Sequence, residues 1–113
     1  MAKVVRLSEL GPHELVEGVR MFPLFGEAAM LSVVDLQPDA VVPLHQHEHE
    51  QLGLVLSGEI TMTIADSDHL CTPEIAYQIP GGVEHGGRAG PDGCRVLDVF
   101  VPVREDYRAL AEG

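Results

Sequence analysis

Three histidines and one glutamine, in two separate segments, are the residues of this chain whose types and spacing could do chemistry. His45, His47 and Gln51 belong to the run PLHQHEHEQ, and His85 follows a Pro-Gly-Gly turn much later in the chain. Alternate residues of an extended segment point to the same face, so His45 and His47 can bind one ion from a single strand, and Gln51 has the same parity. His85 has to arrive from its distant segment.

A metal ion is the ligand that these side chains suit. Imidazole is the commonest protein ligand for metals near neutral pH. Three imidazoles with one amide oxygen suit Zn, Ni, Mn or Fe and leave room for a substrate oxygen. We therefore predict one divalent transition metal ion, held by His45, His47, Gln51 and His85. His49 has the same parity and is an alternative to Gln51, although a position at the surface or beside the site is the favoured interpretation.

Length and charge limit the classes of function. The chain has 113 residues, which predicts a single domain over 1–113, and 45% of them are hydrophobic, enough for a core without disulfides. Its formal net charge of -11 disfavours nucleic acid and anionic membranes as partners, because both attract surfaces rich in lysine and arginine. A small anionic ligand is compatible with this charge if an arginine lies at its site.

The cysteines and the N-terminus favour a cytoplasmic protein. Cys71 and Cys94 form no C-x-x-C motif, and two reduced thiols are the simplest interpretation, with a disulfide between them as the alternative. The first residues lack the continuous apolar stretch of a secretory signal. No run approaches the roughly 18 apolar residues that a membrane-spanning helix needs.

Short β-type runs separated by turn residues predict an all-β fold, either a sandwich or a closed barrel. Val41-Val42 leads into the histidine segment, Ser57-Gly58 is expected to separate two strands, and the glycine-rich residues 81–93 are interpreted as loops around a short strand at His85. The remaining strands are expected over residues 19–25, 28–36, 51–56, 59–64, 69–72, 76–79 and 94–101, with a short helix over 104–111.

The histidine segment resembles the first sequence motif of the cupins, a family of small jelly-roll β-barrels. That motif is a glycine, H-x-H, a glutamate and a second glycine at fixed spacing. The spacing is kept here by His45, His47, Gln51 and Gly58. Gln51 replaces the glutamate, and Asp39 or Ala40 stands where the leading glycine is expected.

The segment around His85 resembles the second cupin motif. Pro80, Gly82 and His85 match its P-x-G-x-x-H core, while Glu74 replaces the leading glycine and Ala89 the final asparagine. A residue other than glycine is strained in a left-handed conformation, so Glu74 puts one turn in doubt. The resemblance covers residues 28–102. It implies a single cupin jelly-roll barrel around the metal site, with a homodimer as the usual assembly.

A narrower resemblance comes from the H-x-H-x-H-E-Q segment, the later strand Val-Leu-Asp-Val-Phe and the tail Arg-Glu-Asp-Tyr. Together they are similar to the KdgF-type cupins of pectin and alginate breakdown, which convert 4,5-unsaturated uronates into linear keto-uronates. The resemblance implies that Asp98 and Phe100 face the cavity and that Arg104 holds the substrate. Polyketide-cyclase cupins also use three histidines and a glutamine.

Asp98 is the candidate general acid or base. A carboxylate in the middle of an apolar strand either lines a cavity, where burial raises its pKa, or faces solvent or an arginine at an edge. We assign catalytic roles to Asp98 and Arg104. Phe100, Tyr77 and Met30 are assigned to the substrate pocket, with core packing as the alternative for Tyr77 and Met30.

The neutral side chain of Gln51 influences the choice of reaction. With three neutral imidazoles, a divalent ion keeps a net charge of about +2, which favours an anionic or enolate-bearing ligand. A redox site built on histidines and a carboxylate fits less well. The leading prediction is a non-redox enzyme acting on a small anionic sugar such as an unsaturated uronate. The alternatives are a polyketide cyclase, a lyase, an iron dioxygenase, or a non-catalytic cupin that binds a sugar or another small molecule.

Overall fold

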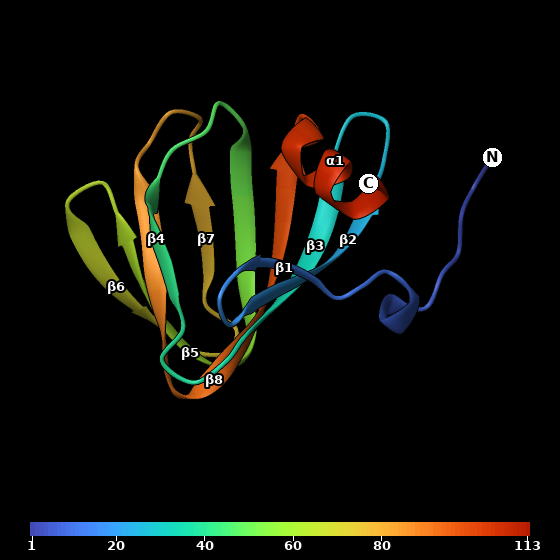
Figure 1. The fold of residues 1–113 in the computed structure, drawn as a ribbon. Coiled ribbons are helices and arrows are strands. Elements are labelled where there is room, and N and C mark those ends of the chain that lie inside the picture. The colour runs from blue at the N-terminus through green and yellow to red at the C-terminus, as the bar shows by residue number, and fades with distance from the viewer.

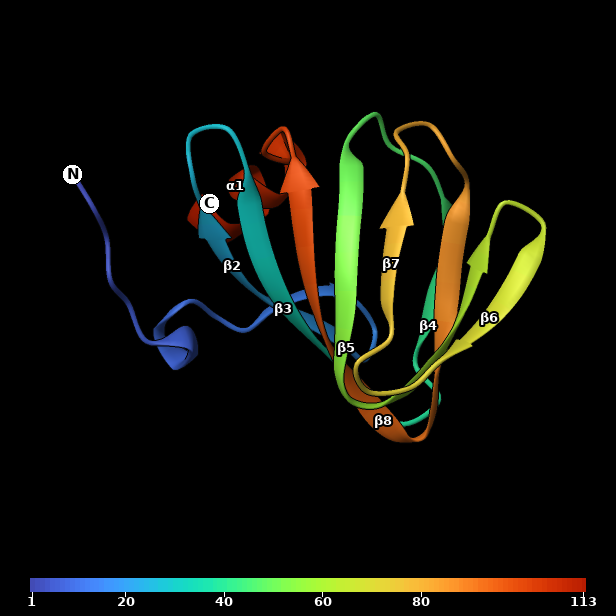
Figure 2. The same ribbon diagram turned by 180° about the vertical axis from the view of Figure 1, so that it is seen from behind.

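The computed structural model describes residues 1–113 as a set of eight strands with one short helix (Figures 1 and 2). A 3-10 helix, η1 (Leu7–Glu9), precedes the strands, and the helix α1 (Glu105–Glu112) follows them within one residue of the predicted range. The strands are β1 (His13–Val16), β2 (Val19–Phe25), β3 (Met30–Leu36), β4 (Val41–His45), β5 (Glu50–Ile64), β6 (Ser67–Cys71), β7 (Ala76–Ile79) and β8 (His85–Val101).

Two long strands, β5 and β8, connect the two halves of the barrel. They pair antiparallel along their length, from Glu50 with Val101 to Ile64 with His85. In the first half β8 also pairs with β3, and β5 with β7, while β2 and β1 extend the sheet beyond β3. In the second half β8 pairs with β4, and β5 with β6.

Both long strands bend in the middle, so the two halves face each other (Figure 1). We call this turning point the bend. The opposite end, where β4 ends, β5 begins and β8 both begins and ends, we call the rim. In Figure 1 the strand β1 crosses between the halves, and α1 lies beside the rim end of β3.

The strand β5 continues through the predicted break at Ser57-Gly58. Its pairing with β8 is irregular on both sides of this dipeptide, between Val55 and Ser57 and between Gly58 and Ile60. A bulge turns a strand without ending it, and here it forms the bend. Gly58 has a φ of 71°, and a Cβ at this position would collide with the carbonyl oxygen of Gly93. Glycine is therefore required by the bend rather than by a chain break.

The strand β8 begins at His85 and continues without interruption to Val101, although the sequence predicts only a short strand at His85 with loops around it up to residue 93. The glycines that suggest loops instead let β4 approach closely. A Cβ at Gly86 would lie 2.7 Å from the carbonyl oxygen of Val42, and the backbone could not keep this distance with a larger residue. The sequence also misses β1, which has only four residues and pairs only with β2.

Alternation of side chains places one face of each strand inside the barrel. In β5 Gln51, Gly53 and Val55 are buried, whereas Leu52 and Leu56 are exposed, as the alternation predicts. The main buried cluster comprises Val19, Met21, Val34, Leu36, Val55, Ile60, Met62, Cys71, Ile79, Ala89, Cys94 and Val96. A smaller cluster, near the rim, contains Met30, Phe100 and Val103.

Two positions where the cupin motifs have glycine adopt left-handed backbone conformations with other residues. Asp39 has a φ of 61° and Glu74 a φ of 76°. Aspartate tolerates this region because its short side chain can bond locally, whereas glutamate carries a larger steric cost. The turn that Glu74 puts in doubt therefore keeps a conformation suited to glycine.

Both cysteines, Cys71 and Cys94, are buried and unpaired, which agrees with the interpretation as two free thiols. None of the helices has the length and hydropathy that crossing a membrane requires.

Candidate metal centre and cavity

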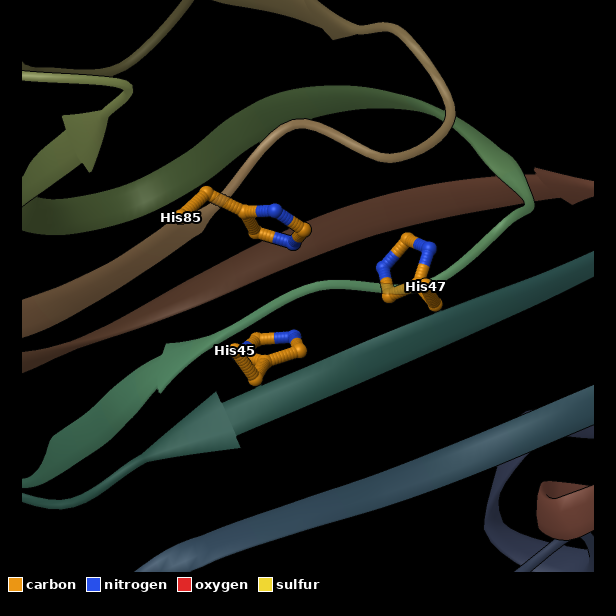
Figure 3. Close-up of side chains that lie close together, drawn as sticks. All are labelled: His45, His47 and His85. Carbon is orange, nitrogen blue, oxygen red and sulfur yellow. The ribbon is translucent and has the colours of Figure 1, made fainter.

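Three histidine side chains meet at the rim, where the sequence predicts the metal (Figure 3). His45 ends β4, His47 lies in the connection to β5, and His85 begins β8. His45 and His85 are partners in the pairing of β4 with β8, which brings the two distant segments together. One ring nitrogen of each histidine lies within 4.8 Å of the other two, and Figure 3 shows the rings turned toward a common space.

A backbone carbonyl group fixes each of the three imidazoles. In His45, His47 and His85, Nδ1 lies 2.9, 3.0 and 2.9 Å from the carbonyl oxygen of a residue two positions away in the chain. A carbonyl oxygen only accepts, so Nδ1 donates in each ring, and the neutral imidazole offers the lone pair of Nε2. Metal-binding histidines are commonly held by this kind of hydrogen bond.

The side-chain oxygen of Gln51 completes the set. Its Oε1 lies 3.2 Å from Nε2 of His47 and 3.1 Å from Nε2 of His85. The side chain of Gln51 also lies beside the carboxylate of Asp98 and lowers its pKa. A carboxylate only accepts, so the amide N–H group faces Asp98 and the amide oxygen faces the histidines. Oxygen and imidazole lone pairs then point at one another with no proton between them, an arrangement that a cation relieves. The residues therefore fit a divalent transition metal ion.

Protonation of His47 and His85 does not compete with a metal near neutral pH. Burial lowers the pKa of His47 to about 4, and the positive charges of Arg104 and His85 contribute in the same direction. Burial also lowers the pKa of His85. Both imidazoles are therefore neutral at pH 7, which is the form that binds metals.

Asp98 lies inside the barrel, at the inward-facing position of β8 two residues before Phe100. The hydroxyl group of Tyr77 donates to its Oδ1 at 2.8 Å. Burial raises the pKa of Asp98 to about 6, while the hydrogen bond from Tyr77, the side chain of Gln51 and the charge of Arg104 act against this increase. Burial, followed by the neighbouring Asp98, raises the pKa of Tyr77, so the phenol keeps its proton as a donor. The hydrogen bond from Tyr77 thus holds Asp98 in a fixed orientation beside Gln51.

Tyr77 reaches Asp98 by lying across Gly53. The two residues are partners in the pairing of β5 with β7. A Cβ at Gly53 would occupy the space of the Tyr77 ring and hydroxyl. Glycine weakens the interior of a strand and often marks a close approach of another group. Here it creates the space in which Tyr77 bonds Asp98.

Arg104 provides a buried positive charge at the rim. The Tyr107 ring lies 3.7 Å and the Phe100 ring 5.1 Å from its Cζ, measured to the ring centroids. Asp106 accepts from its Nε at 3.3 Å and from its Nη2 at 2.8 Å. Its Nη1 is buried and has no hydrogen-bond partner. A buried donor without a partner is costly, so Nη1 marks a place where an anion would bind.

The side chains of this site, apart from that of His47, line one cavity of about 550 Å³, a volume common among small-molecule pockets. Its polar side chains are those of His45, Gln51, Tyr77, His85, Asp98, Arg104 and Asp106. Valine, leucine, isoleucine and methionine side chains make up most of the remaining wall. The strand β1 and the helix α1 also contribute, with Leu15, Val16, Tyr107 and Leu110.

Of the assigned pocket residues, Phe100 and Tyr77 line the cavity and Met30 does not. Met30 is buried against Phe100 and Val103, because Phe100, its partner on β8, takes the lining position at this level. His49 stands outside the converging histidines, and its carbonyl oxygen instead accepts from Nδ1 of His47.

The residues that support Arg104 escaped the sequence reasoning. Asp106 and Tyr107 belong to the tail Arg-Glu-Asp-Tyr, and the sequence predicts no separate role for either residue. The spacing of Arg104, Asp106 and Tyr107 could have indicated this contact. Both later residues lie in the first turn of α1, which places them beside the arginine that precedes the helix.

Comparison with known proteins identifies relatives of this barrel. H2HPP isomerase from Bacillus subtilis is 37% identical over 76 residues, which are 66% of this chain and 32% of the isomerase. The chain thus spans about a third of the length of that relative. KdgF from Halomonas sp. is 25% identical, with a TM-score of 0.88 over 95% of this chain and 99% of KdgF. The polyketide cyclase RemF from Streptomyces resistomycificus is 25% identical, with a TM-score of 0.77 over 92% of this chain and 87% of the cyclase.

These structures confirm the jelly-roll barrel and the resemblance to KdgF that the sequence predicts. The family described as "Cupin domain" matches residues 32–100, which is more than half of the chain and includes both motifs. This chain belongs to the cupin family.

Proposed function

We propose that this chain is a metal-dependent, non-redox enzyme acting on a small oxygenated carboxylate. One observation carries the proposal: His45, Gln51 and His85, three of the four neutral metal-binding side chains, line the same cavity as buried Arg104, whose Nη1 is unpaired. A divalent ion held by His45, His47, Gln51 and His85 would supply Lewis-acid stabilisation of an enolate or alkoxide. None of these side chains is charged, so this end of the cavity stays positive and attracts anions.

Arg104 binds the substrate carboxylate in this proposal. Its Nη1 is free to donate, while Asp106 and the ring of Tyr107 hold the guanidinium in place. A charge-assisted hydrogen bond to a carboxylate is about twice as strong as a neutral one. The substrate is thereby oriented with its carboxylate at the helix α1 and its reacting part toward Asp98.

Asp98 moves the proton. It is the carboxylate in the cavity wall nearest the metal-binding glutamine, and Tyr77 and Gln51 fix its orientation. It accepts a proton at one substrate position and returns it at another, which consumes no oxidant or reductant. The similarity to a protein named as an isomerase supports a reaction of this kind.

A 4,5-unsaturated uronate is the named substrate to test first. The support is the resemblance to KdgF-type cupins in the motifs and the similarity to KdgF from Halomonas sp.. Metal-replete protein, loaded in turn with Zn, Ni, Mn and Fe, is mixed with unsaturated galacturonate, and the absorbance of the double bond is followed. Ketonisation removes this absorbance. A constant absorbance with every metal would remove the uronate from the proposal.

Variants separate the two roles on any substrate that turns over. Asp98→Asn is expected to lower kcat by about 10² to 10⁴, the range for lost general acid–base catalysis. Arg104→Gln is expected to raise KM, whereas Arg88→Gln, which changes an exposed arginine, serves as the matched control. Full turnover by Asp98→Asn would exclude the proton transfer. Oxygen consumption during turnover would instead indicate a dioxygenase.

The proposal includes a homodimer in the cytoplasm. Leu52 and Val101 lie on neighbouring strands of the outer sheet face and are each 44% exposed, with the half-buried Leu97 and Val99 beside them on β8. A contiguous exposed apolar face is typical of an interface, and a second copy would cover it. The free thiols support a reducing compartment.

A further inference from the structure

The cavity is divided along its length into a polar and an apolar part. Its charged and hydrogen-bonding side chains come from residues at the rim and from α1. The wall toward the bend is formed by Val34, Leu36, Val42, Ile60, Met62 and Val96. The metal-binding set and the proton-transferring carboxylate use only the polar part, so the apolar wall has no role in the reaction derived above.

The pairing of the strands shows where the polar part of the cavity ends and the apolar part begins. On β8 Val96 is the next inward position after Asp98, and it pairs with Val34. In the other half Val42 stands three residues before His45, and its partner Gly87 also pairs with Met62. At roughly 3.3 Å per residue, the apolar wall begins about 7–10 Å from the polar groups. Figures 1 and 2 show the direction, from the rim down to the bend.

We infer that this wall is a binding subsite for hydrocarbon, and that among small carboxylates the cavity prefers those with a branched aliphatic or carbocyclic body to those with a hydroxylated one. The inference rests on the proposed function for the carboxylate end and specifies the remote end. A hydroxyl group of a sugar acid would meet no hydrogen-bond partner among these side chains, which is costly. Each buried methylene group instead increases affinity about fourfold. A fully hydroxylated uronate would therefore use the rim alone.

The entrance suits the same class of ligand. Leu110 of α1 and Val16 of β1 line the cavity and are 49% and 40% exposed, so they lie where the cavity meets solvent. The apolar body of a ligand has no hydrogen bonds to water that it would lose on passing these apolar side chains. Entrance and wall thus present similar surfaces to the hydrocarbon.

A series of 2-oxo acids tests the subsite by isothermal titration calorimetry with metal-replete protein. Pyruvate, 2-oxobutanoate and 4-methyl-2-oxopentanoate share one head group and differ only in hydrocarbon. The three carbon atoms that separate the first from the last are expected to tighten binding about 60-fold, at about fourfold each. Galacturonate, which carries a carboxylate but a hydroxylated body, is expected to bind no more tightly than pyruvate.

Two neighbouring residues of β4 provide a matched pair of variants. Val42 lines the cavity, whereas Val41 is 47% exposed on the outer side of the barrel. Val42→Phe fills the subsite and is expected to remove the preference for 4-methyl-2-oxopentanoate while pyruvate affinity is kept. Val41→Phe is expected to keep the whole gradient. If Val42→Phe fails to fold, Val42→Thr keeps the volume, adds one hydroxyl and is expected to reduce the preference severalfold.

The outcomes separate this inference from the proposed function. Equal affinities across the series, no binding by any member, or a gradient that survives in Val42→Phe would overturn the hydrocarbon subsite. A gradient lost in Val42→Phe, with no turnover of any carboxylate, would support the subsite and refute only the enzyme. Turnover of a carboxylate without an affinity gradient would support the enzyme and refute the hydrocarbon subsite.

Discussion

Removing His85 tests whether two distant segments share one ion. A metal present at about 1,000 times its Kd stabilises a protein by about 4 kcal/mol. For a domain of 113 residues this corresponds to an increase in Tm of about 16 °C, at about 4 °C per kcal/mol. Loss of one of the metal-binding side chains should weaken affinity at least about 100-fold. At the same metal concentration about 1.4 kcal/mol then remains, and the increase in Tm falls to about 6 °C or less.

The assay is the difference in Tm between metal-replete protein and protein in EDTA, measured by scanning calorimetry for Zn, Ni, Mn and Fe. This difference is unaffected by the packing lost with His85→Ala, a residue only 2% exposed, because that loss lowers both values. His69→Ala, at an exposed position of β6, is the control and should keep the full increase. An undiminished increase in His85→Ala, or no increase in the wild type with any of the four metals, would refute the reasoning about the site.

Three further predictions concern other parts of the molecule. Asp106→Asn should raise KM for the anionic substrate about 3–10-fold, because Asp106 holds Arg104 in place. The Tm should stay within about 4 °C of the wild type, because an ion pair with a 59%-exposed side chain adds little stability. An unchanged KM would contradict the role of Asp106 in positioning Arg104. Burial raises the pKa of the Cys94 thiol to about 11. At pH 8 iodoacetamide should therefore alkylate this thiol about 100-fold more slowly in the native than in the unfolded protein. Equal rates of alkylation, measured by mass spectrometry, would show that the thiol is accessible. Leu52→Glu should halve the mass found by light scattering, since it places a charge on the outer face, while a monomeric wild type would exclude the dimer.

The sequence by itself determined the ligand types and the barrel. Parity along an extended chain relates His45 to His47, and residues 51–56 lie in a strand as predicted. These inferences succeed because backbone geometry repeats every two residues whatever the rest of the chain does. Residue type and the second motif relate His85 to the first segment, because no local periodicity connects the two segments.

Tertiary structure decided where the strands end and which groups act together. Gly58, Gly86 and Gly93 lie in segments that are predicted as breaks or loops, yet at each of them a Cβ would come too close to the backbone of another segment. Whether a glycine ends a strand or admits a neighbour depends on an atom from a distant segment, which local sequence does not specify. The same holds for Asp98, Tyr77 and Arg104, whose partners come from different strands and from the last helix. Composition predicts that a hydrophobic core exists, but only the register of β3, β4 and β8 shows that this core encloses a cavity with a polar end and an apolar one.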